Sequence, residues 1–352
     1  MHQSRKGYFR LYFKGRFALN EKAYGYARVL SFNVREDLLT SQNSSFKLEG
    51  VPNAAVEGDI VILIDAYGKK LYTGVIKQIE DIQIDANGIL TLFDDNDFYQ
   101  IGSYSNSNCN ERTEYILNHY KNNNSDDPKI AGLIDQFEIS HDDEYPRGWQ
   151  YDYTEVHTLN VYEQLLKMFD DYSVKITVDI PLNEGQSTIF TGPVNTGIHK
   201  FIDNTVVLTS ITPTVEVQST NKLVIYNQDG TQKRGIYYLT GNGITQDAND
   251  LTRLNIVNTN IVNSDEELST VVANNLEKEM YNHKIVVNMM LDNKLYDYYN
   301  FELGGNFIIS VKAKYYETIW TAYELDLEEG DLDIVTMTFG KVRTKASERY
   351  FQ

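Results

Sequence analysis

The stretch Gly58-Asp59-Ile60-Val61-Ile62, followed by Leu71-Tyr72-Thr73-Gly74-Val75-Ile76, has a counterpart near the other end of the chain. There, Gly305-Asn306-Phe307-Ile308-Ile309 leads to Ile319-Trp320-Thr321-Ala322-Tyr323-Glu324. Each stretch places β-branched and aromatic residues in two short runs, and a polar turn separates the runs. This is the pattern of paired antiparallel strands.

A third run that ends in phenylalanine follows in both halves, Leu90-Thr91-Leu92-Phe93 and Thr336-Met337-Thr338-Phe339. Three strands in succession make a meander, so the repeat predicts two related antiparallel β-barrels on one chain. Its period is too long, and its copies too few, for a solenoid or a propeller. Such paired barrels are more typical of assembly proteins than of enzymes.

The first barrel is expected over residues 1–104, completed by about 198–217. Phe9, Leu11 and Phe13 alternate with polar or amphipathic residues, which indicates a half-buried strand. Further strand patterns, with no helical stretch between them, cover 27–34, 45–48, 60–64, 71–79 and 89–93.

An inserted α+β domain is expected over 105–197. One helix is predicted over 111–120, with Ile116, Leu117 and Tyr120 as its apolar contacts. A second begins at about Asn160, which with Glu163 has the spacing of a capping box. Its apolar face is expected to comprise Tyr162, Leu165, Leu166 and Phe169.

The second barrel is expected over 218–255 and 284–345. A hairpin is predicted from 223–226 and 235–239 around the turn Asn227-Gln228-Asp229-Gly230. An inserted helical segment over 256–283 is expected to begin with a capping box of Ser264 and Glu267. The predicted fold class is α+β, mostly β: two related antiparallel β-barrel domains with inserted α/β segments, and a basic tail at 346–352.

The net charge of −18 is unevenly distributed along the 352 residues. Seven basic residues and one acidic residue give the first 28 residues a charge of +6, so the remainder carries −24. An acidic body argues against a dedicated nucleic-acid-binding protein. The basic N-terminal arm could dock on an acidic neighbour, or it could be a strand with one solvated basic face.

No catalytic, metal or cofactor site is predicted. The chain has no zinc-protease, phosphate-loop or serine-hydrolase motif. His141-Asp142-Asp143-Glu144 and Asp94–Asp97 lack metal-ligand spacing and are expected to be solvated loops. The lone Cys109, expected in a polar loop before a helix, cannot form an intrachain disulfide. No apolar run reaches the ~20 residues that cross a bilayer, and no signal peptide is evident, so a soluble protein made in a cytoplasm is expected.

Three segments resemble those of phage tail baseplate hub proteins, also called tail-associated proteins, of phages that infect Gram-positive bacteria. They are Asn221–Asn227 with Gly235–Leu239, the turn Leu303-Gly304-Gly305, and the C-terminal Thr338-Phe339-Gly340-Lys341-Val342-Arg343. The first meander also resembles the family's N-terminal barrel. Together these segments cover most of the chain.

The resemblance implies a non-enzymatic virion protein at the distal tip of the tail. It implies a homotrimer whose six barrels adapt a sixfold tail tube to a threefold tip and form part of the DNA-ejection channel. Its expected partners are the distal tail protein or tail tube above, tip or receptor-binding proteins below, and the tape measure protein and DNA within. The candidate partner-contact residues are Arg10, Lys14, Arg16, Arg343, Lys345, Arg349, Tyr350 and Phe351.

Two other functions remain open. A receptor-binding or cell-wall-carbohydrate-binding tail module is suggested by the 26 tyrosines and by Trp149 and Trp320. A tail-associated cell-wall hydrolase is disfavoured by the missing motifs. Under the hub hypothesis, an acidic channel lining is expected, because charge repulsion keeps DNA from sticking in transit.

Overall fold

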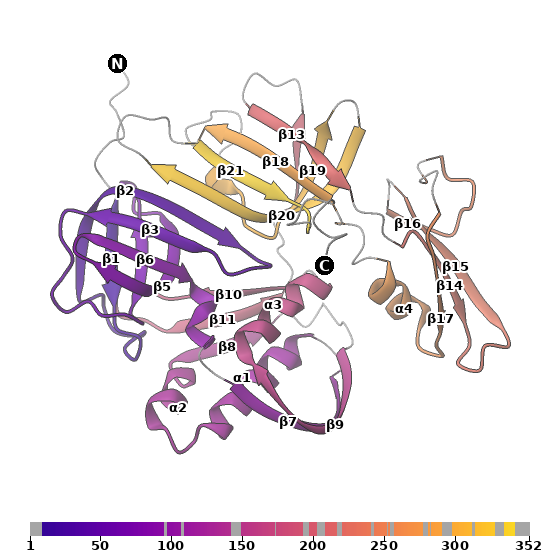
Figure 1. Ribbon diagram of the computed structural model, residues 1–352, viewed down its shortest axis with the longest axis horizontal. Helices are drawn as coiled ribbons and strands as arrows, with labels where there is room; N and C mark the ends of the chain where they lie inside the picture. The colour runs from indigo at the N-terminus through magenta and orange to yellow at the C-terminus, as the bar shows by residue number, and fades with distance from the viewer. Residues whose placement is uncertain are drawn as a thin grey trace. The chain divides into compact units, whose positions relative to one another are not determined.

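The computed structural model describes most of the chain, in two compact units (Figure 1). The first unit contains 1–169, 174–193 and 324–334, and the second contains 170–173, 194–323 and 335–352. The described residues are 9–94, 97–106, 109–141, 149–172, 174–192, 197–202, 208–216, 220–240, 243–251, 253, 257–276, 281, 283–290, 298–311, 314–327 and 334–341.

A closed six-stranded antiparallel barrel forms the N-terminal part of the first unit, drawn in indigo in Figure 1. The strand order is β1-β4-β5-β6-β3-β2, and β2 pairs with β1 to close it. The six strands are β1 (Arg10–Lys14), β2 (Gly25–Asp37), β3 (Asn43–Leu48), β4 (Ile60–Ile64), β5 (Lys70–Glu80) and β6 (Gln83–Gly88). The barrel is therefore complete without residues 198–217, which were expected to finish it.

Alternating side chains fill the barrel, as the pattern of the first strand predicts. Leu11 and Phe13 are fully buried, and Phe9 meets Phe32 edge to face at 5.2 Å between ring centroids. Gly74 makes room for an aromatic ring, because a Cβ there would lie 2.3 Å from the Tyr72 hydroxyl. That hydroxyl donates to the carbonyl of Ala86, so the glycine and the tyrosine pack as one unit.

The predicted strand at the end of the first meander is wrong. Ile89–Phe93 forms a 3₁₀ helix, η1, and the third strand is β6, which ends at Gly88. Thr91 donates its hydroxyl to the carbonyl of Gly88, which favours the tight turn. Only Ile84 and Ala86 of β6 are buried, so the strand has a weak apolar pattern, whereas the run after it is apolar because Leu92 and Phe93 are buried.

The inserted α+β part follows the barrel in the same unit. Its helices are α1 (Cys109–Asn123), α2 (Pro128–Ile134) and α3 (Val161–Tyr172). A three-stranded sheet has the order β10-β11-β8, and a long antiparallel pair joins β7 to β9. These strands are β7 (Asp97–Asn106), β8 (Phe137–His141), β9 (Trp149–Asn160), β10 (Lys175–Asp179) and β11 (Ser187–Gly192).

Both predicted helices of the insert are present. The buried face of α3 includes Tyr162, Leu165 and Phe169, and Met168 and Val161 extend it, while Leu166 is half-buried. The Asn160 side chain accepts a hydrogen bond from the backbone N–H of Glu163 at 3.1 Å, so Asn160 caps the helix as expected.

A further run of six strands has the order β12-β19-β20-β21-β18-β13 and lies in the second unit, except for residues 324–327 of β20 and Ile334. Its strands are β12 (Ile198–Ile202), β13 (Leu208–Glu216), β18 (His283–Met290), β19 (Asn306–Val311), β20 (Lys314–Leu327) and β21 (Ile334–Phe339). β12 runs parallel to β19, whereas its counterpart β1 runs antiparallel to β4. The residues expected to complete the first barrel thus pair within this sheet instead.

Aromatic rings form the core of this second sheet. Phe307 lies 4.9 Å from Phe339 and 5.1 Å from Phe201, measured between ring centroids. Trp320 is 2% exposed and packs edge to face on Tyr298. The phenylalanine that ends the second meander is therefore a core residue.

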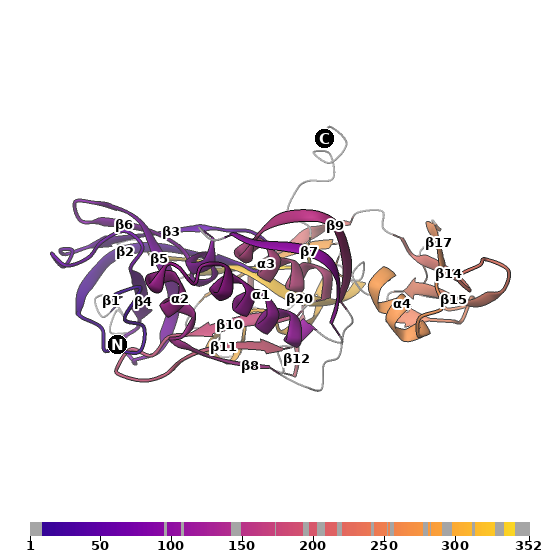
Figure 2. The ribbon, with the colours of Figure 1, turned by 90° about the horizontal axis from the view of Figure 1, so that it is seen from below.

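The described residues between 222 and 276 form a separate small sheet and helix, visible in Figure 2, rather than strands of the second barrel. The sheet order is β16-β15-β14-β17, and α4 (Leu268–Asn275) packs against it. Its strands are β14 (Lys222–Tyr226), β15 (Lys233–Thr240), β16 (Gly243–Thr245) and β17 (Thr259–Asn263). The apolar side chains of β14, Leu223 and Ile225, pack on α4, so they have no role in a barrel core.

The hairpin in this segment is as predicted, but the capping box is not. Gly230 takes a φ of 75° and donates to the carbonyl of Asn227. The helix begins one residue after Glu267, whose side chain makes no capping hydrogen bond. Ser264 accepts from the N–H of Glu266 instead, because it lies too far before the first turn to cap it.

Each of the two meanders starts with a turn, and the two turns have the same backbone geometry. Gly58, with φ 89°, donates to the carbonyl of Ile76, and Gly304, with φ 94°, donates to that of Trp320. The residue after each glycine makes the reciprocal bond: the carbonyl of Asp59 accepts from the N–H of Ile76, and the carbonyl of Gly305 accepts from the N–H of Trp320. The structural correspondence therefore pairs Gly58 with Gly304, one residue away from the match suggested by the sequence.

Candidate functional site

Three of the predicted partner-contact residues are described: Arg10 and Lys14 lie on β1, and Arg16 lies in the connection between β1 and β2. Arg10 is exposed, and its guanidinium carbon lies 5.5 Å from the centre of the Tyr26 ring. Arg16 is half-buried and donates to the carbonyl of Leu92 at 2.8 Å. Arg16 thus contributes to holding η1 against the β1–β2 loop, while Arg10 remains a surface residue.

Lys14 is not on the surface, contrary to the prediction. It is 1% exposed, and its ammonium donates to the backbone carbonyl of Pro181 in the insert. Burial, with the neighbouring charge of Lys70, lowers the pKa of Lys14 to about 8. Alternation placed Lys14 on the outer face correctly, but the insert covers that face of β1.

The segment of the insert that follows β10 covers this outer face of β1. Lys70 of β5 forms an ion pair with Asp179 and donates to the carbonyl of Ile180 at 2.8 Å. Two lysines from two barrel strands therefore hold consecutive residues of the insert. This coverage explains why all five residues of β4, on both faces, are buried.

The remaining predicted contacts, Arg343, Lys345, Arg349, Tyr350 and Phe351, lie outside the described residues. So do Asp142, Asp143 and Glu144 of the acidic run. Cys109 begins α1 rather than lying in the loop before it.

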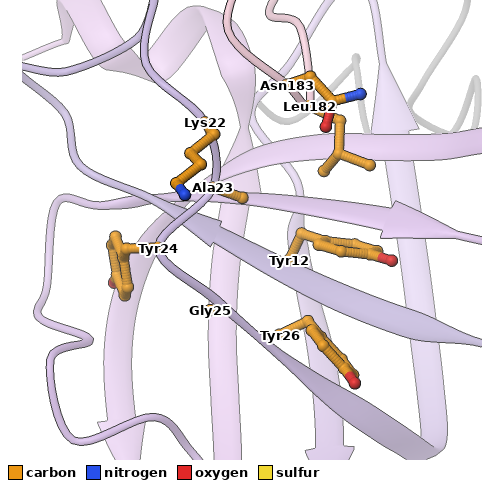
Figure 3. A pocket seen from close by; sticks show the side chains of 8 residues that line it. All are labelled: Tyr12, Lys22, Ala23, Tyr24, Gly25, Tyr26, Leu182 and Asn183. Atoms are coloured by element: carbon orange, nitrogen blue, oxygen red, sulfur yellow. The ribbon is translucent and has the colours of Figure 1, made fainter.

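A hollow of about 550 Å³ lies where the insert stops covering the barrel (Figure 3). It is lined by the β1–β2 connection and by the loop after β10. The lining residues are Tyr12, Lys22, Ala23, Tyr24, Gly25, Tyr26, Leu182 and Asn183. We call this the tyrosine hollow.

Hydrogen bonds fix the walls of the tyrosine hollow. The Tyr24 hydroxyl donates to Asp59 at 2.6 Å, and burial, with that bond, raises the pKa of Tyr24. The N–H of Ala23 donates to the carbonyl of Leu182 at 3.0 Å. Farther along the same loop, the side chain of Asn20 accepts from the N–H of Ser187 at 2.7 Å. The loop from the insert is thus tied to the loop from the barrel.

The chemistry of the tyrosine hollow suits binding rather than catalysis. It joins three phenol rings to one ammonium and one amide, and no nucleophile–base pair lines it. Within the described residues, no cluster of His, Cys, Asp and Glu could hold a metal ion. No helix among them is long and apolar enough to cross a membrane.

Sequence reasoning missed this site, although one signal was present. Tyr12 alternates with Leu11 and Phe13, which placed it on the outer face of β1. Its partner across the strand pair is Tyr26, a register that the sequence does not reveal. Of the two tryptophans that suggested a glycan surface, Trp320 is buried and the side chain of Trp149 lies outside the described residues.

No protein-family model matches the chain, and no curated protein does. Solved structures of similar fold include phage tail proteins. A prophage tail protein, gp18, from Listeria monocytogenes is 13% identical with a TM-score of 0.55, covering 98% of both chains. A tail protein from Neisseria meningitidis is 8% identical with a TM-score of 0.53, covering 95% of this chain and 96% of its own. The 43 kDa tail protein of prophage MuSo2 from Shewanella oneidensis is 10% identical with a TM-score of 0.52, covering 96% and 97%. Along nearly its whole length, the chain has the fold of these phage tail proteins.

Proposed function

We propose that this chain is a structural protein of a phage tail, the trimeric baseplate hub at the distal end of the tail tube. Three copies would place six barrel-like sheets in a ring, which matches a sixfold tube above and a threefold tip below. The protein acts by assembly and has no catalytic role. It is made in the cytoplasm of the host and resides in the virion.

One observation carries the proposal: the meander β4-β5-β6 is repeated as β19-β20-β21. The two copies share a turn, its positive-φ glycine and a reciprocal pair of backbone hydrogen bonds. Two related sheets on one chain allow a threefold assembly to present a nearly sixfold surface. The full-length likeness to phage tail proteins supports the same role.

The proposed partners follow from the position in the tail. The distal tail protein or the tail tube lies above the ring, and tip or receptor-binding proteins lie below it. The tape measure protein and DNA pass through the centre. Since the chain carries −18 overall, we expect acidic side chains to line the channel and to repel the DNA.

The test is the mass of the purified protein by light scattering across a dilution series, followed by electron microscopy of the particles. A trimer whose averaged images show six lobes is the expected result. A protein that stays monomeric, even with purified tail tubes added, would contradict the hub. A ring with a strongly basic lumen would contradict the acidic channel while leaving the trimer intact.

A further inference from the structure

The tyrosine hollow presents flat aromatic surface to solvent. Tyr12 and Tyr26 face each other across β1 and β2, with ring centroids 5.4 Å apart and planes at 39°. Tyr26 is 60% exposed, and Arg10 lies over its ring. In Figure 3 both rings point the same way from their strands, with Leu182 on the far side of Tyr12. The exposed ring of Tyr26 beside the half-buried ring of Tyr12 forms a platform for a ligand with a flat apolar face.

Hydrogen-bonding groups stand beside this platform. Lys22 and Asn183 are exposed and line the hollow from two different loops. In the part of the chain that the structure describes, neither side chain has a protein partner. An ammonium and an amide so placed can donate to, and in the case of the amide accept from, a bound polar ligand.

Hydrogen bonds hold parts of the wall of the hollow in place. Tyr24 is held by Asp59, and the loop that carries Leu182 and Asn183 is tied to Ala23. Binding would therefore order few side chains, and this lowers the entropic cost of association.

We propose that the tyrosine hollow binds a neutral saccharide, with a sugar ring stacked on Tyr26 and Tyr12. A sugar ring has apolar C–H faces and an edge of hydroxyl groups, which matches ring faces bordered by Lys22 and Asn183. The volume of about 550 Å³ falls in the range of small-ligand sites. This binding goes beyond the structural role proposed above.

Charge and shape distinguish this ligand from other classes. Two positive residues, Arg10 and Lys22, stand at the hollow, and the exposed acidic residues Glu21 and Glu184 are adjacent in sequence to Lys22 and Asn183. The hollow is therefore not strongly positive and suits a polyanion such as nucleic acid poorly. Most of its lining side chains end in a hydroxyl, an amine or an amide, whereas a lipid or other apolar ligand favours a mostly apolar, enclosed site.

The test begins with a glycan array of neutral and anionic bacterial surface saccharides, probed with the full chain. The best neutral ligand is then titrated by saturation-transfer NMR against the wild type, Tyr26→Ala and Asn183→Ala. The matched control is Tyr67→Ala, since Tyr67 is 75% exposed on the β4–β5 turn and does not line the hollow. Circular dichroism and melting temperature verify that each variant is folded.

We expect Tyr26→Ala to weaken binding about tenfold or more, which corresponds to ~1.4 kcal/mol. Tyr26→Phe keeps the ring and should retain most of the affinity, and Tyr67→Ala should bind like the wild type. Binding should change little with salt, because the ligand is neutral.

Three results would overturn the proposal. They are no array signal for any neutral saccharide, equal losses in Tyr26→Ala and Tyr67→Ala, and full binding by Tyr26→Ala. A Tyr26→Ala variant that changes the mass of the particle while no glycan binds would assign the hollow to a protein contact instead. A wild-type protein that binds the sugar but never forms a trimer would refute the hub and leave this site standing.

Discussion

Gly58 and Gly304 occupy the same position in two copies of one turn. Each has a positive φ, and each donates its N–H to the carbonyl of a residue in the long strand that follows, Ile76 or Trp320. The turn is closed in the same way in both copies, by Asp59 donating to Val56 and by Gly305 donating to Glu302. The repeat is thus conserved in backbone geometry where the side chains have diverged.

Replacing either glycine by alanine should destabilise its own half of the chain. An L-residue at this φ is strained by about 1–2 kcal/mol, although Gly58 has room for a methyl group. Gly58→Ala should lower the urea midpoint and speed amide exchange in β4 and β5, and Gly304→Ala should do so in β19 and β20. Gly50→Ala is the control, since Gly50 has no positive φ and nothing within 4 Å. Equal effects of Gly50→Ala and Gly58→Ala would contradict the argument.

Gly340→Ala should cost more than Gly58→Ala. Gly340 has a φ of 83°, and a Cβ there would lie 2.0 Å from the carbonyl oxygen of His283. Strain and collision with backbone act together, so we expect a loss of at least about 2–3 kcal/mol. Denaturant titration of the two variants side by side measures the difference. An equal or smaller loss for Gly340→Ala would show that the backbone of His283 yields.

Lys14 should make stability rise with pH in the alkaline range. Its pKa falls from 10.5 in the unfolded chain to about 8 in the folded protein, because burial disfavours the ammonium. Between these values the unfolded state binds more protons, so the free energy of unfolding increases as pH rises through about 8 toward 10.5. Relative to Lys14→Met, the wild type should gain on the order of 2 kcal/mol across this window.

The measurement is urea unfolding at a series of pH values. Lys47→Met removes an exposed lysine on β3 and keeps Lys14, so it is the matched control and should follow the wild type across the window. A wild type and a Lys14→Met variant that respond alike to pH would show that Lys14 stays fully charged.

Glu324 should contribute acid-sensitive stability to the first unit. Burial would raise the pKa of Glu324, but hydrogen bonds from Asn33 and Arg35, with the guanidinium charge, lower it below its ordinary 4.5. The contribution is present above pH 4.5 and is lost as pH falls through the lowered pKa. The carboxylate is partly exposed, so Glu324→Gln should cost only about 0.2–1 kcal/mol at neutral pH. The difference in thermal stability between the wild type and Glu324→Gln should be smaller at pH 3 than at pH 7. A larger difference at pH 3 would refute the assignment.

The local sequence pattern predicted many of the helices and strands, but it did not predict which strands pair. Phe9, Leu11 and Phe13 predicted β1, and Asn160 predicted the start of α3, because alternation and capping act within a few residues. The 3₁₀ helix at Ile89–Phe93 was missed because burial makes a helical turn and a strand equally apolar. The pairing of β12 with β19 depends on contacts between residues far apart in the chain, which composition does not encode.

The candidate site was harder to predict for the same reason. Arg10, Lys14 and Arg16 look alike as charges in the sequence, yet only Arg10 is a surface residue. Tertiary contacts distinguish them: Asp179–Pro181 of the insert covers the outer face of β1 near Lys14, and Arg16 donates to the carbonyl of Leu92 in η1. Tyr12 and Tyr26 form a platform only because register places them opposite each other.

The order of the strands along the chain determines when each sheet can form during synthesis on the ribosome. The barrel β1–β6 uses residues 10–88 alone, so it can close while the rest of the chain is still being made. The second sheet cannot, because β12 must wait for Asn306–Val311 and β13 for His283–Met290. Until then these early strands have unpaired edges, and the residues of the small sheet β14–β17 and of α4 lie in sequence between them and their partners. A nascent chain is therefore most prone to aggregate late in synthesis. This tendency should fall once β21 is complete and the strands of the second sheet can pair.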